Sequence, residues 1–270
     1  MIIILPFYNV VIISFTTSKE YLLNPLLMFP TIPTFKNYVD LFEDGRVLIG
    51  YRTTLQILLL GVPLNLFLST SFAYGLSRRG YPGRKLIFYL VLFTMLFNGG
   101  IIPMYLLMMK LRLTNTLFSV VLASGMNTFY MIIMRNFFSS LPESLIESAK
   151  LDGAGEWKIL FNIILPLSLP IIATMTLFYT VDRWNEWFNA MIFIKSSSMQ
   201  PLQLVLRSIV LQSQLLDKSS AAGAAAIDKE RFTGGLKMAA VMVTMLPVMC
   251  VFPFLQKYFV KGVLVGAIKS

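Results

Sequence analysis

Histidine is absent from this sequence of 270 residues, and cysteine occurs once, at Cys250. Without histidine the chain lacks the most common metal ligand and the most common general base. A single cysteine excludes an intrachain disulfide and leaves the redox compartment undetermined. The sequence also has no G-x-x-x-x-G-K-[ST] phosphate-binding loop and no nucleophile paired with a base. We therefore expect no metal site, no catalytic residues and no nucleotide site in this chain.

Charge is also scarce, because Asp, Glu, Lys and Arg make up 13% of the residues, against about 25% in soluble domains. Hydrophobic residues make up 56% of the chain. The net charge of +10 is spread over short segments between apolar runs, which indicates contact with anionic lipid headgroups and not with nucleic acid. The sequence therefore predicts an all-α polytopic membrane protein.

Six apolar runs are candidate transmembrane helices within a single domain that covers residues 1–270. They extend over about residues 1–15, 51–76, 86–109, 117–138, 166–188 and 236–260. The first run is shorter than the ~20 residues needed to cross the hydrocarbon, so we interpret it as a truncated span. The short turn after the second run is basic, which marks it as cytoplasmic; its charges are Arg78, Arg79, Arg84 and Lys85. Counting crossings from this turn places residues 140–165 in the cytoplasm and residues 189–235 outside.

The segment from Ser140 to Leu165 reads as neither a membrane span nor a loose linker. Ser140 and Glu143 have the spacing of a capping box, which predicts a helix start, and Asp152-Gly153 predicts the end of that helix. Apolar residues recur at helical spacing before and after this turn, at Leu141, Leu145 and Ala149 and at Trp157, Leu160, Phe161 and Ile164. Two short amphipathic helices joined by a turn would form a projection that docks on another protein.

This segment resembles the EAA loop of ABC importer permeases. The match consists of Glu147-Ser148-Ala149, Gly153, Ile163 and Leu165-Pro166 at the spacing of that motif, with Ser148 in place of the usual alanine. Other parts of the chain resemble the carbohydrate branch of these permeases, in particular the maltose-type second subunit. They are Phe29-Pro30, Asn37-Tyr38, Ala73-Tyr74 and the C-terminal QKYFVKGVLVGAIKS.

The resemblance implies a type I ABC importer permease with six transmembrane helices in the cytoplasmic (inner) membrane of a bacterium. In that family the cytoplasmic EAA loop fits a cleft on an ATPase subunit. This coupling role carries over to Glu147, Ser148, Ala149, Leu151, Asp152, Gly153 and Ala154. The implied partners are a second homologous permease subunit, two cytoplasmic ATPase subunits that hold ATP and Mg, an extracytoplasmic solute-binding protein and membrane lipids. The chain itself is expected to bind no cofactor.

The function implied by the resemblance is the import of oligosaccharide by alternating access. The stretches LDGAGEW and FNGG look closest to the subgroup for longer oligo- or polysaccharides, such as alginate or pectin fragments. Polar residues inside spans are costly in hydrocarbon and tend to face a cavity, so they are candidates for the substrate path. The clearest set lies near the outer end of the fifth run, where one helical face carries Asp182, Asn185 or Glu186, and Asn189. Tyr179, Trp184 and Trp187 lie on or beside this face, and Asn98 and Asn127 are further candidates in earlier runs.

Several of these interpretations have alternatives. Tryptophan and tyrosine near the end of a span also form the interfacial belt of membrane proteins. We expect Gly61 and Pro63 to interrupt the second run, and Asn98-Gly99-Gly100 to break the third, either to line the path or to let helices cross closely. An ion-coupled secondary transporter would need an inverted repeat and coupled intramembrane charges, of which only Asp182 and Glu186 are visible. A membrane-embedded enzyme is disfavoured by the lack of histidine.

Overall fold

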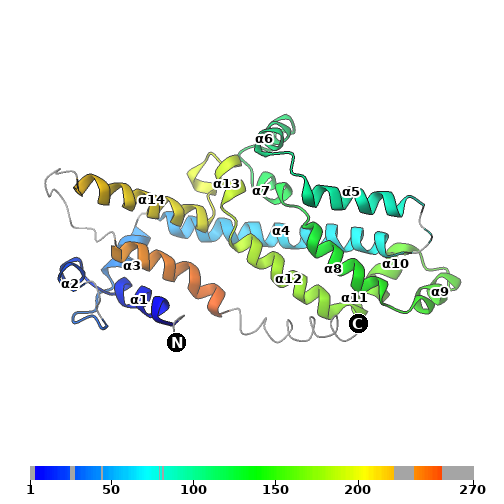
Figure 1. The fold of residues 1–270 in the computed structure, drawn as a ribbon, viewed down its shortest axis with the longest axis horizontal. Coiled ribbons are helices and arrows are strands. Elements are labelled where there is room, and N and C mark those ends of the chain that lie inside the picture. Colours follow the sequence, from blue (N-terminus) through cyan, green and yellow to red (C-terminus); the bar gives the residue numbers. More distant parts are fainter. Residues whose placement is uncertain are drawn as a thin grey trace. The chain divides into compact units, whose positions relative to one another are not determined.

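The computed structural model describes residues 4–24, 28–43, 45–78, 80, 82–221 and 234–250 (Figure 1). Regular secondary structure in these ranges is helical and contains no strand, which confirms the predicted all-α fold. Arg79, residues 222–233 of the predicted outer loop, the end of the predicted sixth span and the C-terminal tail lie outside the described residues. The chain forms two compact units, of which the first combines the residues up to Leu55 with Glu186–Phe252 and the second contains Gln56–Asn185.

The first unit contains short helices and the start of one long helix. They are α1 (Ile4–Ser14), α2 (Ser18–Leu23), α3 (Lys36–Glu43), the first residues of α4 (Arg46–Ser77), α13 (Phe188–Phe193), η2 (Ser197–Met199), α14 (Leu202–Ala221) and a helix over Gly234–Cys250. The buried side chain of Asn37 donates to the backbone oxygens of Ser14 (2.9 Å) and Thr16 (3.1 Å). Tyr38 shares a hydrogen bond of 2.8 Å with Ser14 Oγ. The Asn37-Tyr38 pair therefore ties α3 to the end of α1.

The start of α14 packs directly on α4. The backbone N–H of Leu202 donates to Thr54 Oγ1 over 2.9 Å, so a side chain of α4 satisfies a donor in the first turn of α14. Gly50 permits this close approach, because a Cβ atom at that position would lie 2.9 Å from the Cα atom of Leu202.

The second unit contains the rest of α4 and the helices up to Asn185. They are α5 (Arg84–Leu96), α6 (Ile101–Lys110), α7 (Leu117–Ala123), α8 (Thr128–Ser139), α9 (Glu143–Leu151), α10 (Glu156–Ile159), the π-helical η1 (Leu160–Ile164), α11 (Leu165–Leu167) and α12 (Leu169–Trp184). Buried apolar side chains from α4, α8, η1 and α12 form its core, among them Ala73, Met131, Phe138, Leu160 and Met175. This core also takes up one face of α9, so the segment after the fourth apolar run is packed against the spans.

Among the described helices, α4 alone is long and apolar enough to cross a membrane by itself. Three helix pairs pass the same test together but are bent at a short break: α5 with α6 by 113°, α7 with α8 by 57°, and Glu156–Leu167 with α12 by 88°. The described residues thus contain one to four candidate spans, and the six-span topology stays a prediction. The expected break at Asn98-Gly99-Gly100 is confirmed, since it lies between the end of α5 and the start of α6.

The expectation that Gly61 and Pro63 interrupt the second apolar run is wrong. α4 is continuous from Arg46 to Ser77 and contains Pro63 in its interior. Proline removes one hydrogen bond from a helix, but in an apolar environment the remaining backbone groups have no competing water and keep their helical partners.

Gly50→Ala and Gly75→Ala provide a matched test of packing along α4. The methyl group added at position 50 would overlap the Leu202 backbone, so Gly50→Ala should destabilise the protein by about 1–3 kcal/mol. At position 75 a Cβ atom meets nothing within 4 Å, and Gly75→Ala should be neutral or stabilising by up to about 1 kcal/mol. Unfolding of the purified protein in mixed micelles would measure both, and equal losses would contradict the described packing of α14 on α4.

Candidate functional site

A tight turn ends the first helix of the segment that resembles the EAA loop. Gly153 follows α9 with φ of +76°, in the left-handed region that favours glycine. The N–H of Gly153 donates to the carbonyl of Lys150 (3.0 Å), and the N–H of Ala154 donates to the carbonyl of Ala149 (2.9 Å). These two bonds form a Schellman motif, so the predicted helix end at Gly153 is confirmed.

The start of this helix differs from the prediction. Ser140 ends α8, and its hydroxyl donates to the carbonyl of Phe137 over 2.8 Å. α9 begins at Glu143 after Pro142, and no side chain caps its first turn. The predicted capping box of Ser140 with Glu143 is therefore wrong. α8 extends to the residue before Ser140, and the serine hydroxyl satisfies a carbonyl at the C-terminal end of α8.

The side chains of α9 divide between a buried and an exposed face. Ile146 and Ala149 lie in the core of the second unit. Of the other predicted coupling residues, Ala154 is half-buried and the rest are exposed: Glu147, Ser148, Leu151, Asp152 and Gly153. Leu151 exposes 89% of its surface and Trp157 in α10 exposes 60%. A packed segment that presents large apolar side chains to the outside is suited to contact with a partner protein.

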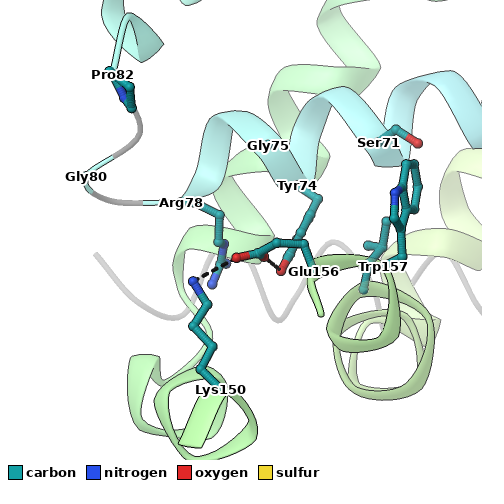
Figure 2. Close-up of a pocket in the computed structure, with 10 residues that line it drawn as sticks. Ser71, Tyr74, Gly75, Arg78, Gly80, Pro82, Lys150, Glu156 and Trp157 are labelled. Atoms are coloured by element: carbon teal, nitrogen blue, oxygen red, sulfur yellow. Dashed lines mark hydrogen bonds and ion pairs between the residues drawn. The ribbon is translucent and has the colours of Figure 1, made fainter. Parts of the chain in front are cut away.

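Figure 2 shows the polar contacts that hold α10 against α4. The hydroxyl of Tyr74 donates to one carboxylate oxygen of Glu156, and Lys150 Nζ lies 2.7 Å from the other. The guanidinium of Arg78 stands over the Tyr74 ring, 5.0 Å from its centroid. Burial lowers the pKa of Arg78, and nearby Tyr74 and Glu156 counteract this shift. The cluster thus connects the end of α4 with both helices of the projecting segment.

A cleft of about 550 Å³ lies beside this cluster. Its walls include Ser71 and Gly75 of α4, Pro82 of the following turn and Trp157 of α10 (Figure 2). The Trp157 ring is parallel to the ring of Phe67, with centroids 6.3 Å apart. The cleft therefore lies at the base of the projecting segment and shares its charged residues.

Three of the predicted path residues meet where the fourth apolar run is broken, between α7 and α8. The side chain of Asn127 caps α8 by accepting two N–H groups of its first turn at 2.9 and 3.4 Å. The N–H of Asn127 donates to the hydroxyl of Tyr179 over 3.1 Å. The ring of Tyr130 packs edge-on against that of Tyr179, with centroids 5.0 Å apart, and the exposed Asp182 is near enough to both to interact electrostatically. The structure therefore brings Asn127, Tyr179 and Asp182 to one place in the second unit.

Two aromatic path candidates are interior residues. Tyr179 is 2% exposed, and its hydroxyl also forms a hydrogen bond of 2.6 Å with Ser69 Oγ. Trp184 is 9% exposed. This burial favours a packing role for both side chains, and their contact with substrate stays a prediction.

The remaining path candidates do not share one helical face, and that prediction is wrong. α12 ends at Trp184, and Asn185 follows as its C-cap with a side chain that donates to Val181 O over 3.0 Å. The carboxylate of Glu186 accepts hydrogen bonds from the N–H and the side chain of Asn189 at 3.1 and 3.0 Å, at the start of α13. Each of these polar side chains thus satisfies backbone groups at a helix end.

The last two path candidates, Asn98 and Trp187, also make contacts within the protein. The side chain of Asn98 accepts the N–H of Gly100 over 2.9 Å at the break between α5 and α6. In the first unit, the guanidinium of Arg207 stacks on the ring of Trp187, 3.8 Å from its centroid. One face of Trp187 is thus covered by a cation and not open to a sugar ring.

The sequence interpretation missed Arg183, Asn65 and Arg207. Arg183 is 2% exposed and lies next to the predicted Asp182. The signal that could have found it is a basic residue within an apolar run, which requires partners in the protein. Among the described residues no group of three His, Cys, Asp or Glu side chains could hold a metal ion.

The long apolar helix, the broken helix pairs and the projecting segment of α9 and α10 are features of a helical membrane protein of the permease class. The chain belongs to the family of binding-protein-dependent transport system inner membrane components, whose profile matches residues 53–265. The protein is thus an inner membrane component of a bacterial transport system, and the resemblance to ABC importer permeases is confirmed.

Relatives and a solved structure agree with this family. The chain is 38% identical to the polygalacturonan/rhamnogalacturonan transport system permease protein YtcP of Bacillus subtilis (strain 168), over 100% of this chain and 94% of the relative. It is 28% identical to the arabinooligosaccharides transport system permease protein AraQ of Halalkalibacterium halodurans, over 100% and 92%. A chain in the crystal structure of a bacterial ABC transporter involved in the import of the acidic polysaccharide alginate matches with a TM-score of 0.82 and 28% identity, over 94% of this chain and 90% of that one.

A double-mutant cycle with Tyr74→Phe and Glu156→Gln tests the link between α4 and α10. A hydrogen bond to a carboxylate at a half-exposed site should give a coupling energy of about 1–2 kcal/mol. Lys150→Met removes the half-exposed ion pair with Glu156 and should lower the free energy of unfolding by less than about 1 kcal/mol. Unfolding of the three variants and the double variant in mixed micelles would measure these values. A coupling energy near zero would show that Tyr74 does not hold α10.

Proposed function

We propose that this chain is one of two transmembrane subunits of an ABC importer for oligosaccharides, and that the segment 140–165 is its coupling loop to a cytoplasmic ATPase. The observation that carries the proposal is the projecting α9. It is fixed to the core by Ile146 and Ala149 and exposes Glu147, Leu151 and Asp152. The names of relatives that carry polygalacturonan and arabinooligosaccharides support a sugar oligomer as the cargo.

We further propose the remaining features of the complex, which membership of this family supports. The chain forms six spans, pairs with a second homologous permease and receives substrate from a solute-binding protein. Two ATPase subunits hold ATP and Mg, and this chain binds no cofactor and catalyses no reaction. Its role is to change the transport cavity from an inward-facing to an outward-facing conformation when the ATPases close.

The coupling loop can transmit this closure because its two helices are fixed to each other and to α4. The Schellman turn at Gly153 fixes the angle between α9 and the residues that follow. The Tyr74–Glu156 and Lys150–Glu156 contacts hold α10 and α9 to the end of α4. Movement of the ATPase can favour one cavity state only through contacts that differ between the two states, and a segment that deforms would lose that difference.

Gly153→Ala and Gly155→Ala form a matched pair that tests the coupling loop. Gly153 has φ of +76°, so a Cβ atom strains the turn, whereas Gly155 has φ of −71° and open space around it. In the reconstituted complex we expect Gly153→Ala to reduce sugar-stimulated ATP hydrolysis about fivefold or more and Gly155→Ala to leave it unchanged. Glu147→Lys, which changes the exposed face without straining the turn, should also remove the stimulation. Full stimulation in all three variants would contradict the coupling role.

The substrate is further proposed to be an acidic oligosaccharide, which the outer segment contacts through Arg207. Arg207 is exposed, and its guanidinium carbon lies 3.8 Å from the centroid of the Trp187 ring. We propose that the N–H edge of this guanidinium faces the substrate. Such an edge binds a carboxylate with two parallel hydrogen bonds. The relative named for polygalacturonan and the solved transporter named for alginate both handle uronate polymers, in agreement with this choice.

Arg207→Gln should therefore weaken the transport of a uronate oligosaccharide and spare that of a neutral one. The KM for the uronate oligomer should rise about tenfold, as for the loss of one charge-assisted contact, with little change in kcat. Transport competition between galacturonate and neutral arabinose oligomers in proteoliposomes would measure the ratio. Equal losses for both sugars would assign Arg207 to the docking of the binding protein and contradict its role in substrate selection.

A further inference from the structure

A buried cation at the end of α12 has no role in the function described so far. Arg183 is 2% exposed, although it lies in a chain whose apolar helices cross the membrane. A buried guanidinium is costly unless its donors all find acceptors, and arginine cannot lose its charge to avoid that cost. Its partners therefore determine what the residue does.

The guanidinium of Arg183 donates hydrogen bonds to the last turn of α7. Its Nη2 donates to the backbone oxygens of Val121 (2.9 Å) and Ser124 (2.7 Å), and its Nη1 donates to the oxygen of Val120 (3.2 Å) and to Ser124 Oγ (2.8 Å). Carbonyls at the end of a helix lack partners within it, and they carry the negative end of the helix dipole. A cation placed there satisfies both the hydrogen bonds and the charge.

Asn65 of α4 completes the same arrangement. It is fully buried, its Oδ1 accepts the Nε–H of Arg183 over 2.9 Å, and its Nδ2 donates to the oxygens of Ser124 and Gly125 at 2.8 Å each. Side chains from two other helices thus satisfy the carbonyls on the α7 side of the break. Irregular backbone within a membrane persists only where protein groups satisfy it in this way.

Gly61 provides the space for this contact. A Cβ atom at position 61 would lie 2.8 Å from Arg183 Nε and 3.2 Å from its Cδ. The glycine that the sequence suggested as a helix interruption is instead a point of close approach between α4 and the arginine.

The break fixed by Arg183 carries the polar residues of the predicted substrate path. Asn127 and Tyr130 lie on the α8 side of the break, Tyr130 packs against the ring of Tyr179 in α12, and the exposed Asp182 directly precedes Arg183 in the chain. We propose that Arg183 is a positioning residue for transport: by holding the end of α7 together with Asn65, it sets the two half-helices, Tyr130 and the exposed Asp182 in their working geometry. This inference rests on the proposed function.

The test uses the complete complex in proteoliposomes, with both permeases, the ATPases and the binding protein. The quantity measured is the number of sugar molecules imported per ATP hydrolysed, which does not depend on how much complex assembles. Arg183→Gln and Gly61→Ala should lower this ratio about tenfold, a typical size for the loss of coupling between sites. Arg183→Lys keeps the charge but reaches fewer acceptors, and its ratio should lie between those of wild type and Arg183→Gln.

Thr180→Val is the matched control. The Thr180 hydroxyl lies on the same helix and donates to Thr176 O of that helix over 2.7 Å, so its loss should leave the ratio unchanged. If the Arg183→Gln complex does not assemble, the Gly61→Ala variant tests the proposal instead. Alanine has a higher helix propensity than glycine, so α4 should still form, while the added methyl group displaces the guanidinium. A lower melting temperature with an unchanged ratio in Gly61→Ala would show a purely structural role and overturn the proposal. A wild-type complex without sugar-dependent ATP hydrolysis would overturn the proposed function itself.

Discussion

Every backbone N–H and C=O group that leaves a helix within the membrane must find a partner in the protein, and the second unit is organised by this constraint. The fourth apolar run shows how the requirement is met. Arg183 and Asn65 satisfy the carbonyls at the end of α7, while Asn127 caps the start of α8 and donates its own N–H to Tyr179. The break between the two half-helices thereby becomes a defined structure that holds polar side chains.

At the end of α9 the same backbone groups are satisfied by local bonds. The end of α9 uses a Schellman turn at Gly153, which needs no side chain from another helix. The tertiary contacts of this segment instead connect α9 and α10 to α4 through Glu156. The segment 140–165 is thus fixed to the core of the second unit while Leu151 remains exposed.

This difference explains what the sequence could and could not predict. The turn at Gly153 and the break at Asn98-Gly99-Gly100 depend on local residue types, and both were predicted correctly. The capping box at Ser140 failed because α8 continues up to that serine, a length set by its packing in the core. Arg183 was missed because its partners lie 59 to 118 residues away in the chain, and no local pattern indicates them.

Several arginines of the second unit donate hydrogen bonds to carbonyl groups at helix ends, and these bonds account for part of the positive net charge. Arg135 of α8 donates to Leu76 O near the end of α4 (3.2 Å), and Arg78 after α4 donates to Phe138 O near the end of α8 (3.4 Å). These two helices therefore cap each other, as Arg183 caps α7. The charge of +10 is in part a consequence of satisfying helix carbonyls, and by itself it does not indicate an acidic substrate. Arg207 of the first unit differs in its surroundings, because its guanidinium lies over the face of Trp187, 3.8 Å from the ring centroid.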